Sequence, residues 1–321
     1  MFTERFRFGL EELKLVRSLK DVRILLEKVG YLLPRLVGYS FVHSDVPPSL
    51  QLEPTNICNA SCICCSTRNS QRKKGFMSVQ LFRSIIDQAA EIGVKRIHLY
   101  LHGEPLLHPQ IAEMIRYIKE KKLVVHLTTN GMPLDPKKIT TLLGTGLTMA
   151  DHLMFSVLGN SAEVHKQVMP GVNHKRVVNN IFNLVELRQS KKMNGPVVET
   201  IFYTMPENEH EQRAFLDFWL GKVDHVRVVG KISNFFANYH TSDNKQYSRQ
   251  HTCSNLWERM TIYWNGDVTI CCADVNGEYT LGNLQNKSIL ELWTCPKMNE
   301  IKKIHQQKEF QKIPICNHCD V

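Results

Sequence analysis

The sequence predicts an α/β fold, a partial (β/α)6 parallel barrel with an N-terminal helical segment and a small C-terminal cysteine-rich domain. Three observations predict it. Six apolar stretches alternate with amphipathic ones between residues 49 and 232, as in a parallel sheet with helical crossovers. A helical apolar periodicity precedes this region, and six of the ten cysteines follow it. We therefore divide the chain into residues 1–48, 49–232 and 233–321.

The first segment is expected to be helical, because apolar residues recur at helical spacing from Leu10 to Val37 with basic residues between them. We expect its apolar stripe to pack against the main domain, with Pro34 ending or kinking the helix. A basic amphipathic helix could instead lie on a membrane surface or bind a partner helix.

The barrel region gives six strands and five helices. Strands are expected at Leu50–Glu53, Arg96–Leu101, Val124–Thr128, His152–Val157, Val197–Tyr203 and His225–Val229. Helices are expected at Ser78–Ile92, Gln110–Lys122, Pro136–Leu143, Lys175–Gln189 and Glu209–Leu220, with Ser78 and Asn208 as N-caps. Functional residues of such a fold are expected in the loops that follow the strands. Further on, Asn265-Gly266 predicts a hairpin between Thr261–Trp264 and Val268–Ile270.

Composition narrows the class of protein. With 43% hydrophobic and 22% charged residues, the chain of 321 residues can bury a large core and is not disordered. The formal charge is +9, but the basic residues are scattered, so we expect no nucleic-acid partner. No apolar stretch is long enough to cross a membrane, and the N-terminus lacks a signal-peptide pattern. We therefore expect a cytoplasmic protein without a transmembrane segment.

Ten cysteines in a chain without a signal peptide are expected to be metal ligands or catalytic groups rather than disulfides. Cys58, Cys62, Cys64 and Cys65 form one group, and the other six lie between Cys253 and Cys319. Two metal sites, one from each group, are the simplest interpretation.

Directly after the first expected strand, Cys58, Cys62 and Cys65 have the spacing C-x3-C-x2-C. Three thiolates from one loop leave the fourth position of a [4Fe–4S] cube or a zinc ion for a ligand from outside the protein. A zinc knuckle is an alternative on spacing alone, disfavoured by the position of the loop. The loop resembles that of the radical S-adenosylmethionine (SAM) superfamily, and the resemblance extends from Leu50 to the C-terminus. It implies that the three cysteines hold a [4Fe–4S] cluster that cleaves SAM to a 5′-deoxyadenosyl radical. Cys64 is not expected to be a ligand.

Motifs at the next strand ends agree with this resemblance. His102-Gly103-Glu104-Pro105 resembles the family's GGEP motif, with His in place of the first Gly, and Thr129-Asn130-Gly131 resembles its TNG segment. Ser156 matches the serine at the end of strand four. The resemblance implies that SAM is bound by Gly103, Glu104, Pro105, Thr129, Asn130 and Ser156. Leu158 and Met169 stand where relatives carry Asp and Arg, and we expect both to pack in the core.

The second cysteine group could be a four-cysteine zinc site in a generic protein. After a radical SAM core it resembles the SPASM/twitch extension instead. Three segments support this, Trp264–Asp274, Leu281–Leu284 and Leu290–Trp293. The resemblance implies one auxiliary [4Fe–4S] cluster, held by Cys253, Cys271, Cys316 and Cys319, and a reductant such as flavodoxin or ferredoxin as partner.

The expected activity is that of a radical SAM oxidoreductase or epimerase acting on a small polar substrate. The chain resembles the small SPASM/twitch enzymes of sugars and aminocyclitols, among them 2-deoxy-scyllo-inosamine dehydrogenase and the aminoglycoside epimerases. We favour oxidation through the auxiliary cluster; in an epimerase, Cys272 would return a hydrogen atom. Candidate substrate contacts are His102, His126, Tyr203, Arg227, Lys231 and Asn234. The alternatives are a maturase of ribosomal peptides and, in another class, a non-catalytic zinc- or nucleic-acid-binding protein.

Overall fold

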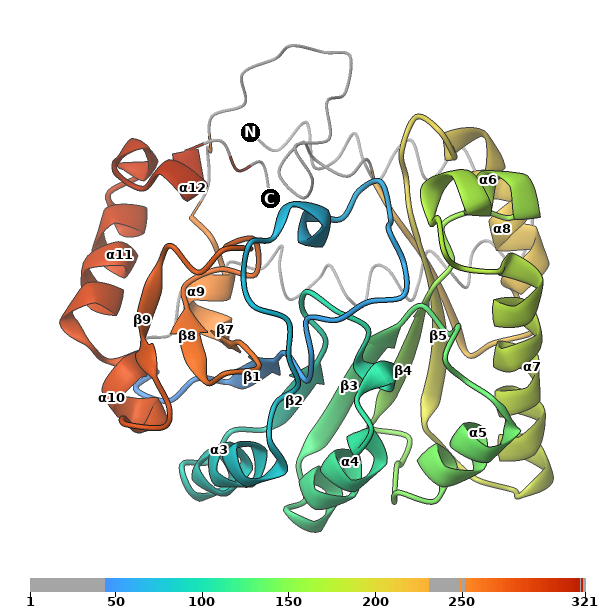
Figure 1. Cartoon of the computed structure of the whole chain (residues 1–321), viewed down its shortest axis with the longest axis horizontal. Helices are drawn as coiled ribbons and strands as arrows, with labels where there is room; N and C mark the ends of the chain where they lie inside the picture. The colour runs from blue at the N-terminus through green and yellow to red at the C-terminus, as the bar shows by residue number, and fades with distance from the viewer. Residues whose placement is uncertain (1–43, 231–248, 250–251, 318, 320–321) are drawn as a thin grey trace.

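The computed structural model describes residues 44–230, 249, 252–317 and 319 (Figure 1). The expected N-terminal helix, Lys231 and Asn234 lie outside the described residues. Within them, a single mixed sheet of nine strands has the order β6-β5-β4-β3-β2-β1-β7-β8-β9.

Strands β1 to β6 are all parallel and follow one another across the sheet. Their bounds are β1 Ser49–Leu52, β2 Arg96–Leu99, β3 Val124–Thr129, β4 His152–Ser156, β5 Val197–Tyr203 and β6 His225–Val229. All six strands were predicted from the sequence, each within two residues at either end. The second edge of β1 pairs with β7, so the six strands form an open, partial barrel, as predicted.

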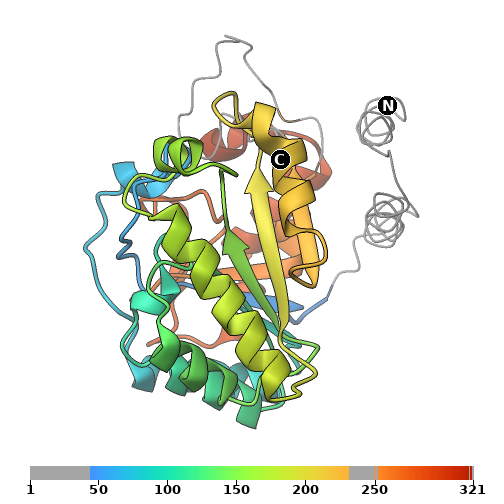
Figure 2. The same cartoon turned by 90° about the vertical axis from the view of Figure 1, so that its right-hand side faces the viewer.

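Helices connect these strands and cover one face of the sheet, the outer face, as Figure 1 shows for α3, α4 and α5 and Figure 2 for α7. Their bounds are α3 Val79–Glu91, α4 Ile111–Glu120, α5 Pro136–Leu143, α6 Ala162–Val168, α7 His174–Ser190 and α8 Gln212–Trp219. Short 3-10 turns precede some of them, η1 Ser66–Asn69, η2 Pro105–Leu107 and η3 Glu209–Glu211. The outer face carries the core, in which Val125, Leu127, Leu153 and Phe155 are each 1% exposed or less.

The two predicted N-caps have different outcomes. The Ser78 side chain accepts a hydrogen bond from the Leu81 amide and caps α3, as predicted. Asn208 stands at the N-cap position of η3, as predicted, but without a side-chain cap. Its Oδ1 instead accepts from the Met205 amide, while Nδ2 donates to the carbonyls of Leu158 and Tyr203. Asn208 therefore ties the ends of β4 and β5 together.

The C-terminal region continues the same sheet. Strand β7 (Arg259–Ile262) pairs in parallel with β1. Strand β8 (Asp267–Thr269) pairs antiparallel with β7, and β9 (Thr280–Asn283) pairs antiparallel with β8. The predicted Asn265-Gly266 hairpin joins β7 to β8, with Gly266 at a φ of 90° that favours glycine. Helices α9 Asn255–Glu258, α10 Ile289–Trp293, α11 Pro296–Gln306 and α12 Pro314–Asn317 and the turn η5 Phe310–Lys312 complete the region.

The inner face of the sheet, turned away from α3 to α8, is polar and partly exposed. On β3, His126 and Thr128 are partly exposed and alternate with buried residues, and β4 shows the same alternation. The cysteine loop after β1 and the segment after β8 both approach this face. The fold thus brings segments of both cysteine groups to the same side of the sheet.

Candidate active site

The first cysteine loop is held against the end of α6. The amides of Ser61 and Ile63 donate to the carbonyls of Pro170 and Val168, at 2.8 and 3.0 Å. Gly171 allows this approach, because a Cβ there would lie 2.5 Å from the carbonyl oxygen of Asn59, and its φ is 90°. The loop therefore has a fixed position above the carboxyl ends of the strands.

The thiols of this loop are close enough to affect one another. Burial raises the pKa of Cys58 to about 11, with Glu104 and Cys65 adding to the effect. Burial, followed by the other three thiols, also raises the pKa of Cys62 well above its usual value. A nearby positive centre, such as an iron cluster provides, favours the ionised thiolate over the thiol. The donor set therefore fits a [4Fe–4S] cluster.

Among the described residues, no three His, Cys, Asp or Glu side chains are arranged to hold one metal ion. A cube makes no such demand, because each thiolate binds a different iron. A further buried polar atom also fits an additional group at this place. The Nδ2 atom of Asn59, next to Cys58, has no hydrogen-bond partner among the described residues.

The strand-end motif after β2 lies directly against this loop. A Cβ at Gly103 would lie 2.1 Å from the Thr55 carbonyl oxygen, and the Glu104 amide donates to the Ile57 carbonyl at 2.9 Å. Pro105 begins the turn η2 and is buried. Glycine is thus required at 103 for the two segments to meet.

Glu104 joins the ends of β2 and β3. Its carboxylate accepts from the Thr129 hydroxyl (2.7 Å), the Asn130 amide (2.7 Å) and the Leu106 amide (3.0 Å). Burial outweighs these bonds and raises its pKa to about 7. The Asn130 side chain in turn donates to Asn59 Oδ1 at 3.0 Å. Gly103, Glu104, Thr129 and Asn130 are therefore brought together with the cysteine loop.

Ser156, the last residue of β4, stands apart from this group. It is partly exposed, and its hydroxyl has no hydrogen-bond partner within the described part of the chain. Leu158 and Met169 are 3% and 1% exposed, which confirms that both pack in the core.

The second cysteine group also converges. The charges of Cys319 and Cys272 act to raise the pKa of Cys253, and the charge of Cys253 acts in the same way on Cys271. The charges of Cys253 and Cys319 likewise act to raise the pKa of Cys316. Burial raises the pKa of Cys316 to about 12. The Arg249 guanidinium donates to Cys319 Sγ at 2.6 Å. Thiols from three distant segments thus lie near enough to affect one another's pKa values.

His305 of α11 links two of these segments. Its Nδ1 accepts from the Cys253 amide at 3.3 Å, so the proton lies on Nε2, which donates to Cys316 Sγ at 3.3 Å. His305 is fully buried, and burial lowers its pKa to about 4. Sequence analysis missed this residue, because nothing in the spacing of α11 marks it.

A buried polar junction connects the two cysteine regions. Glu53, directly after β1, is fully buried and accepts two bonds from the Arg72 guanidinium, at 2.6 and 2.9 Å, and one from the Trp264 amide at 3.1 Å. His102 lies 3.2 Å from the same carboxylate and contacts the Cys272 carbonyl through Nε2 at 2.7 Å. These partners hold the pKa of Glu53 below its usual value despite burial. Neither Glu53 nor Arg72 belongs to a motif that the sequence could reveal.

The remaining substrate candidates lie on the inner face. Arg227 pairs with the buried Glu199 at 2.6 Å, and His152 lies 3.7 Å from the same carboxylate. The His126 ring lies between those of His98 and His152, edge-to-face with the first and tilted against the second, with ring centroids 5.2 and 4.5 Å apart. Burial raises the pKa of Tyr203 to about 12, and the Cys64 thiol adds to this effect. His126, Tyr203 and Arg227 therefore share one surface, whereas His102 belongs to the junction.

Cys272 lies beside this surface. A hydrogen bond from the Cys271 thiol, the Arg259 guanidinium and His102 lower its pKa to about 6. The same bond raises the pKa of Cys271.

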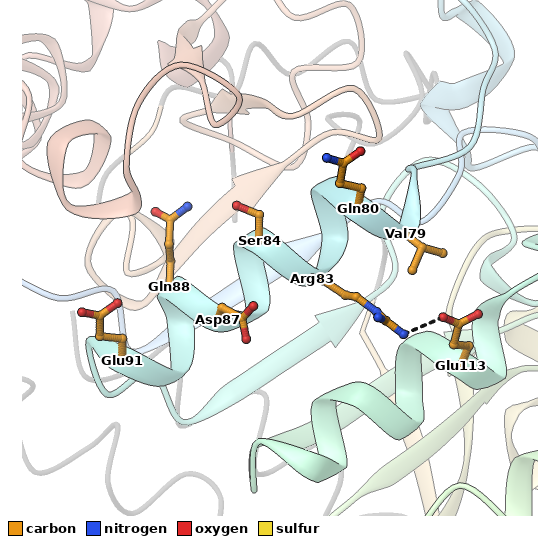
Figure 3. Close-up of a pocket in the computed structure, with 8 residues that line it drawn as sticks. All are labelled: Val79, Gln80, Arg83, Ser84, Asp87, Gln88, Glu91 and Glu113. Atoms are coloured by element: carbon orange, nitrogen blue, oxygen red, sulfur yellow. Dashed lines mark hydrogen bonds and ion pairs between the residues drawn. The ribbon is translucent and has the colours of Figure 1, made fainter.

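A hollow along α3 lies on the outer, helical side of the sheet (Figure 3). It is lined by exposed polar residues and contains the surface ion pair between Arg83 and Glu113, at 2.9 Å. It contains none of the cysteines or strand-end motifs. In the described part of the chain, no helix is long and apolar enough to span a membrane.

Comparison with known families gives two matches. The family described as the radical SAM superfamily matches residues 52–218. The SPASM family, described as an iron-sulfur cluster-binding domain, matches residues 253–320.

Three characterised relatives share parts of the sequence. A tungsten-containing aldehyde ferredoxin oxidoreductase cofactor-modifying protein of Pyrococcus furiosus is 20% identical over 85% of this chain and 87% of its own length. The PqqA peptide cyclase of Gluconobacter oxydans is 33% identical over 34% of this chain and 30% of its own. The mycofactocin maturase MftC of Mycobacterium tuberculosis is 27% identical over 66% of this chain and 53% of its own length. The matches thus span about half or less of the last two relatives.

Two solved structures share the fold. SuiB of Streptococcus suis, bound to the precursor peptide SuiA, has a TM-score of 0.66 at 17% identity, covering 94% of this chain and 79% of SuiB. BtrN, in complex with AdoMet and 2-DOIA, has a TM-score of 0.59 at 17% identity, covering 86% of this chain and 94% of BtrN.

Proposed function

The chain belongs to the radical SAM superfamily, and we propose that it abstracts a hydrogen atom from a residue of a peptide. The observation that carries this proposal is that two relatives, PqqA peptide cyclase and the maturase MftC, are named for work on peptides. The fold shared with SuiB, solved with its precursor peptide, supports it. The peptide alternative is therefore preferred to the small polar substrate expected from the sequence.

The cofactors are SAM and iron–sulfur clusters, as the two matched families imply. In our proposal Cys58, Cys62 and Cys65 hold the SAM-binding cluster, and Cys253, Cys271, Cys316 and Cys319 hold the auxiliary one. Reductive cleavage of bound SAM supplies the radical that removes a hydrogen atom from the substrate. The donor chemistry of both thiol groups fits these assignments.

The protein's own residues position these groups. Both oxygens of the Glu104 carboxylate accept hydrogen bonds from the protein, so its task is to hold the Thr129 and Asn130 strand end against the cysteine loop. Gly103 keeps the backbone close to this loop, which leaves nearby carbonyls to accept from the ammonium group of SAM. The Ser156 hydroxyl, which has no partner among the described residues, is the candidate for a hydrogen bond to SAM.

The inner face of the sheet is the place for the substrate. It lies below the first cysteine loop and beside Cys272, and Tyr203, His126 and Arg227 present polar atoms there. The fate of the substrate radical divides the proposal further. We favour oxidation, with the auxiliary cluster as the electron acceptor, over return of a hydrogen atom from Cys272.

A second candidate is a small polar substrate such as an aminocyclitol. It is favoured by the shared fold with BtrN, whose chain is covered almost completely.

The two substrate classes are separated by deuterium transfer. The anaerobically reconstituted enzyme would be given SAM, dithionite and, in turn, deuterated peptides encoded beside its gene and a deuterated aminocyclitol. We expect deuterium in 5′-deoxyadenosine with a peptide, because the abstracted atom ends in that product. Deuterium transfer from the aminocyclitol alone would overturn the peptide proposal.

A further inference from the structure

Arg259 is the first residue of β7 and differs from Arg227, another arginine of the inner face. Arg227, on β6, pairs with the Glu199 carboxylate at 2.6 Å. Arg259 has no carboxylate partner within the described part of the chain. Its one hydrogen bond there runs from Nη1 to the Tyr100 hydroxyl at 3.3 Å, and its buried Nε has no acceptor. A partly buried guanidinium without an anion is unfavourable, because burial removes water that nothing replaces.

The residues around Arg259 add uncompensated polar groups. His98, on β2, is 4% exposed, and neither of its ring nitrogens has a partner among the described residues. Burial and the nearby Arg259 charge lower its pKa to about 2, so the imidazole is neutral and keeps one N–H donor. The Tyr100 ring, whose hydroxyl accepts from Arg259, has its centroid 5.6 Å from that of the His98 ring. A cation and two neutral donors thus share one place.

The charges facing this place come from the strands beside it, and on β2 they include Arg96, whose charge also acts on His98. Glu199, on β5, is paired with Arg227 at 2.6 Å, and the His152 ring lies 3.7 Å from the same carboxylate. Glu53, after β1, is neutralised by Arg72 and contacts His102. Gln51 and Thr261, the neighbours on β1 and β7, are neutral and bond to each other. The carboxylates of Glu199 and Glu53 are therefore paired with other cations, and neither compensates the charge of Arg259.

The position of Arg259 connects it with both cysteine regions. Its charge acts on Cys272, which follows β8. Tyr100, its hydrogen-bond partner, acts on Tyr203, and Tyr203 also feels Cys64 in the first loop. A group bound here would lie between the two cysteine regions, where a substrate has to be.

We propose that Arg259, with Tyr100 and His98, binds a carboxylate of the substrate. The Nε and Nη2 atoms have no acceptor among the described residues, and this edge of a guanidinium matches a carboxylate in a two-point contact; since Nε is buried, binding has to uncover it. This inference rests on the proposed function, because that proposal supplies the peptide as the class of substrate. The substrate is then a peptide that presents a carboxylate, either that of a Glu or Asp side chain or that of its C-terminus.

Binding of three capped amino acids to the reconstituted holoenzyme tests this without turnover. The probes are N-acetyl-glutamate N-methylamide for a side-chain carboxylate, N-acetylalanine for a terminal one and N-acetyl-glutamine N-methylamide as the neutral control, measured by calorimetry. We expect one carboxylate probe to bind roughly tenfold more tightly than the neutral one, and the stronger of the two identifies the source.

In Arg259→Gln this preference should vanish, and in Arg259→Lys it should persist in weaker form, since Lys keeps the charge but not the two-point geometry. Arg83→Gln, which removes a surface arginine, is the matched control and should keep the full preference. Iron content and cluster absorbance report whether each variant is intact.

Two results would overturn the subsite. One is a wild-type enzyme without preference for carboxylate. The other is an intact Arg259→Gln variant that keeps the preference for carboxylate while the spectrum of the auxiliary cluster changes. Arg259 would then act on Cys272 beside that cluster and not on the substrate. If the Arg259-dependent preference is found but deuterium comes only from an aminocyclitol, the subsite stands and the peptide proposal fails.

Discussion

The Nε2 atom of His102 lies 2.7 Å from the backbone carbonyl oxygen of Cys272. A carbonyl only accepts, so Nε2 carries the proton of this bond. The contact joins the motif after β2 to the loop after β8, 170 residues away. His102 stands where the resembled motif has glycine, and the structure shows what the imidazole adds: a direct tie between the two cysteine regions.

His102→Ala should loosen this tie. We expect a loss of about 1–3 kcal/mol in the free energy of unfolding, because Glu53 and the Cys272 carbonyl lose a buried partner. Product formation should fall more than SAM cleavage, since the auxiliary loop is displaced while the first loop is not. Thermal unfolding and the ratio of product to 5′-deoxyadenosine measure the two effects. An equal fall in both rates would contradict this role.

Replacing Cys58, Cys62 and Cys65 together by Ala should abolish SAM cleavage. The three thiols are the proposed ligands, so about four irons per chain should be lost of the eight in two cubes. Cys64→Ala is the matched control from the same loop and should keep both iron and cleavage. Iron analysis and 5′-deoxyadenosine formation under dithionite provide the test. Persistent cleavage in the triple variant would refute the ligand set.

His305→Ala should lower the reduction potential of the auxiliary cluster. The Nε2–H of His305 donates to Cys316 Sγ, and such bonds stabilise the more negative, reduced form. Redox titration followed by electron paramagnetic resonance reads the potential directly. His305→Gln, which can still donate, should restore part of the shift. A potential unchanged in the Ala variant would show that this bond is absent in the loaded enzyme.

Glu104 should make folding stability depend on pH. Its pKa rises from 4.5 to about 7 on folding, so the native state holds a proton that the unfolded state has released. Stability should therefore fall between about pH 4.5 and pH 7, by about 3 kcal/mol at most. Glu104→Gln should remove this slope. Unfolding midpoints of the two proteins across this range decide the matter, and parallel curves would contradict the shift.

Turnover in deuterated water should distinguish the two fates of the substrate radical. A thiol exchanges with solvent, whereas oxidation removes an electron and a proton and forms no new C–H bond. We expect an oxidised product without solvent deuterium, in wild type and in Cys272→Ala alike. One deuterium at an inverted carbon, lost in the Cys272 variant, would instead identify Cys272 as the hydrogen donor.

Much of the fold could be predicted from local patterns. The six parallel strands and the α5 boundaries followed from periodicity and turn residues, because these depend on neighbours within a few positions. The side-chain cap expected of Asn208, at the N-cap position of η3, is absent for the opposite reason. Its polar side chain fits a cap locally, but the ends of β4 and β5 bring carbonyls that compete for it.

By itself the sequence determined the cysteine spacing, the strand-end motifs and hence the family. Tertiary structure alone decided which distant groups meet. Ser49 lies beside Arg259 only because β7 pairs with β1, and that pairing also places Arg259 on the inner face with no carboxylate beside it. Sheet register between segments about 210 residues apart depends on the packing of the whole sheet, since no local preference of either segment encodes it.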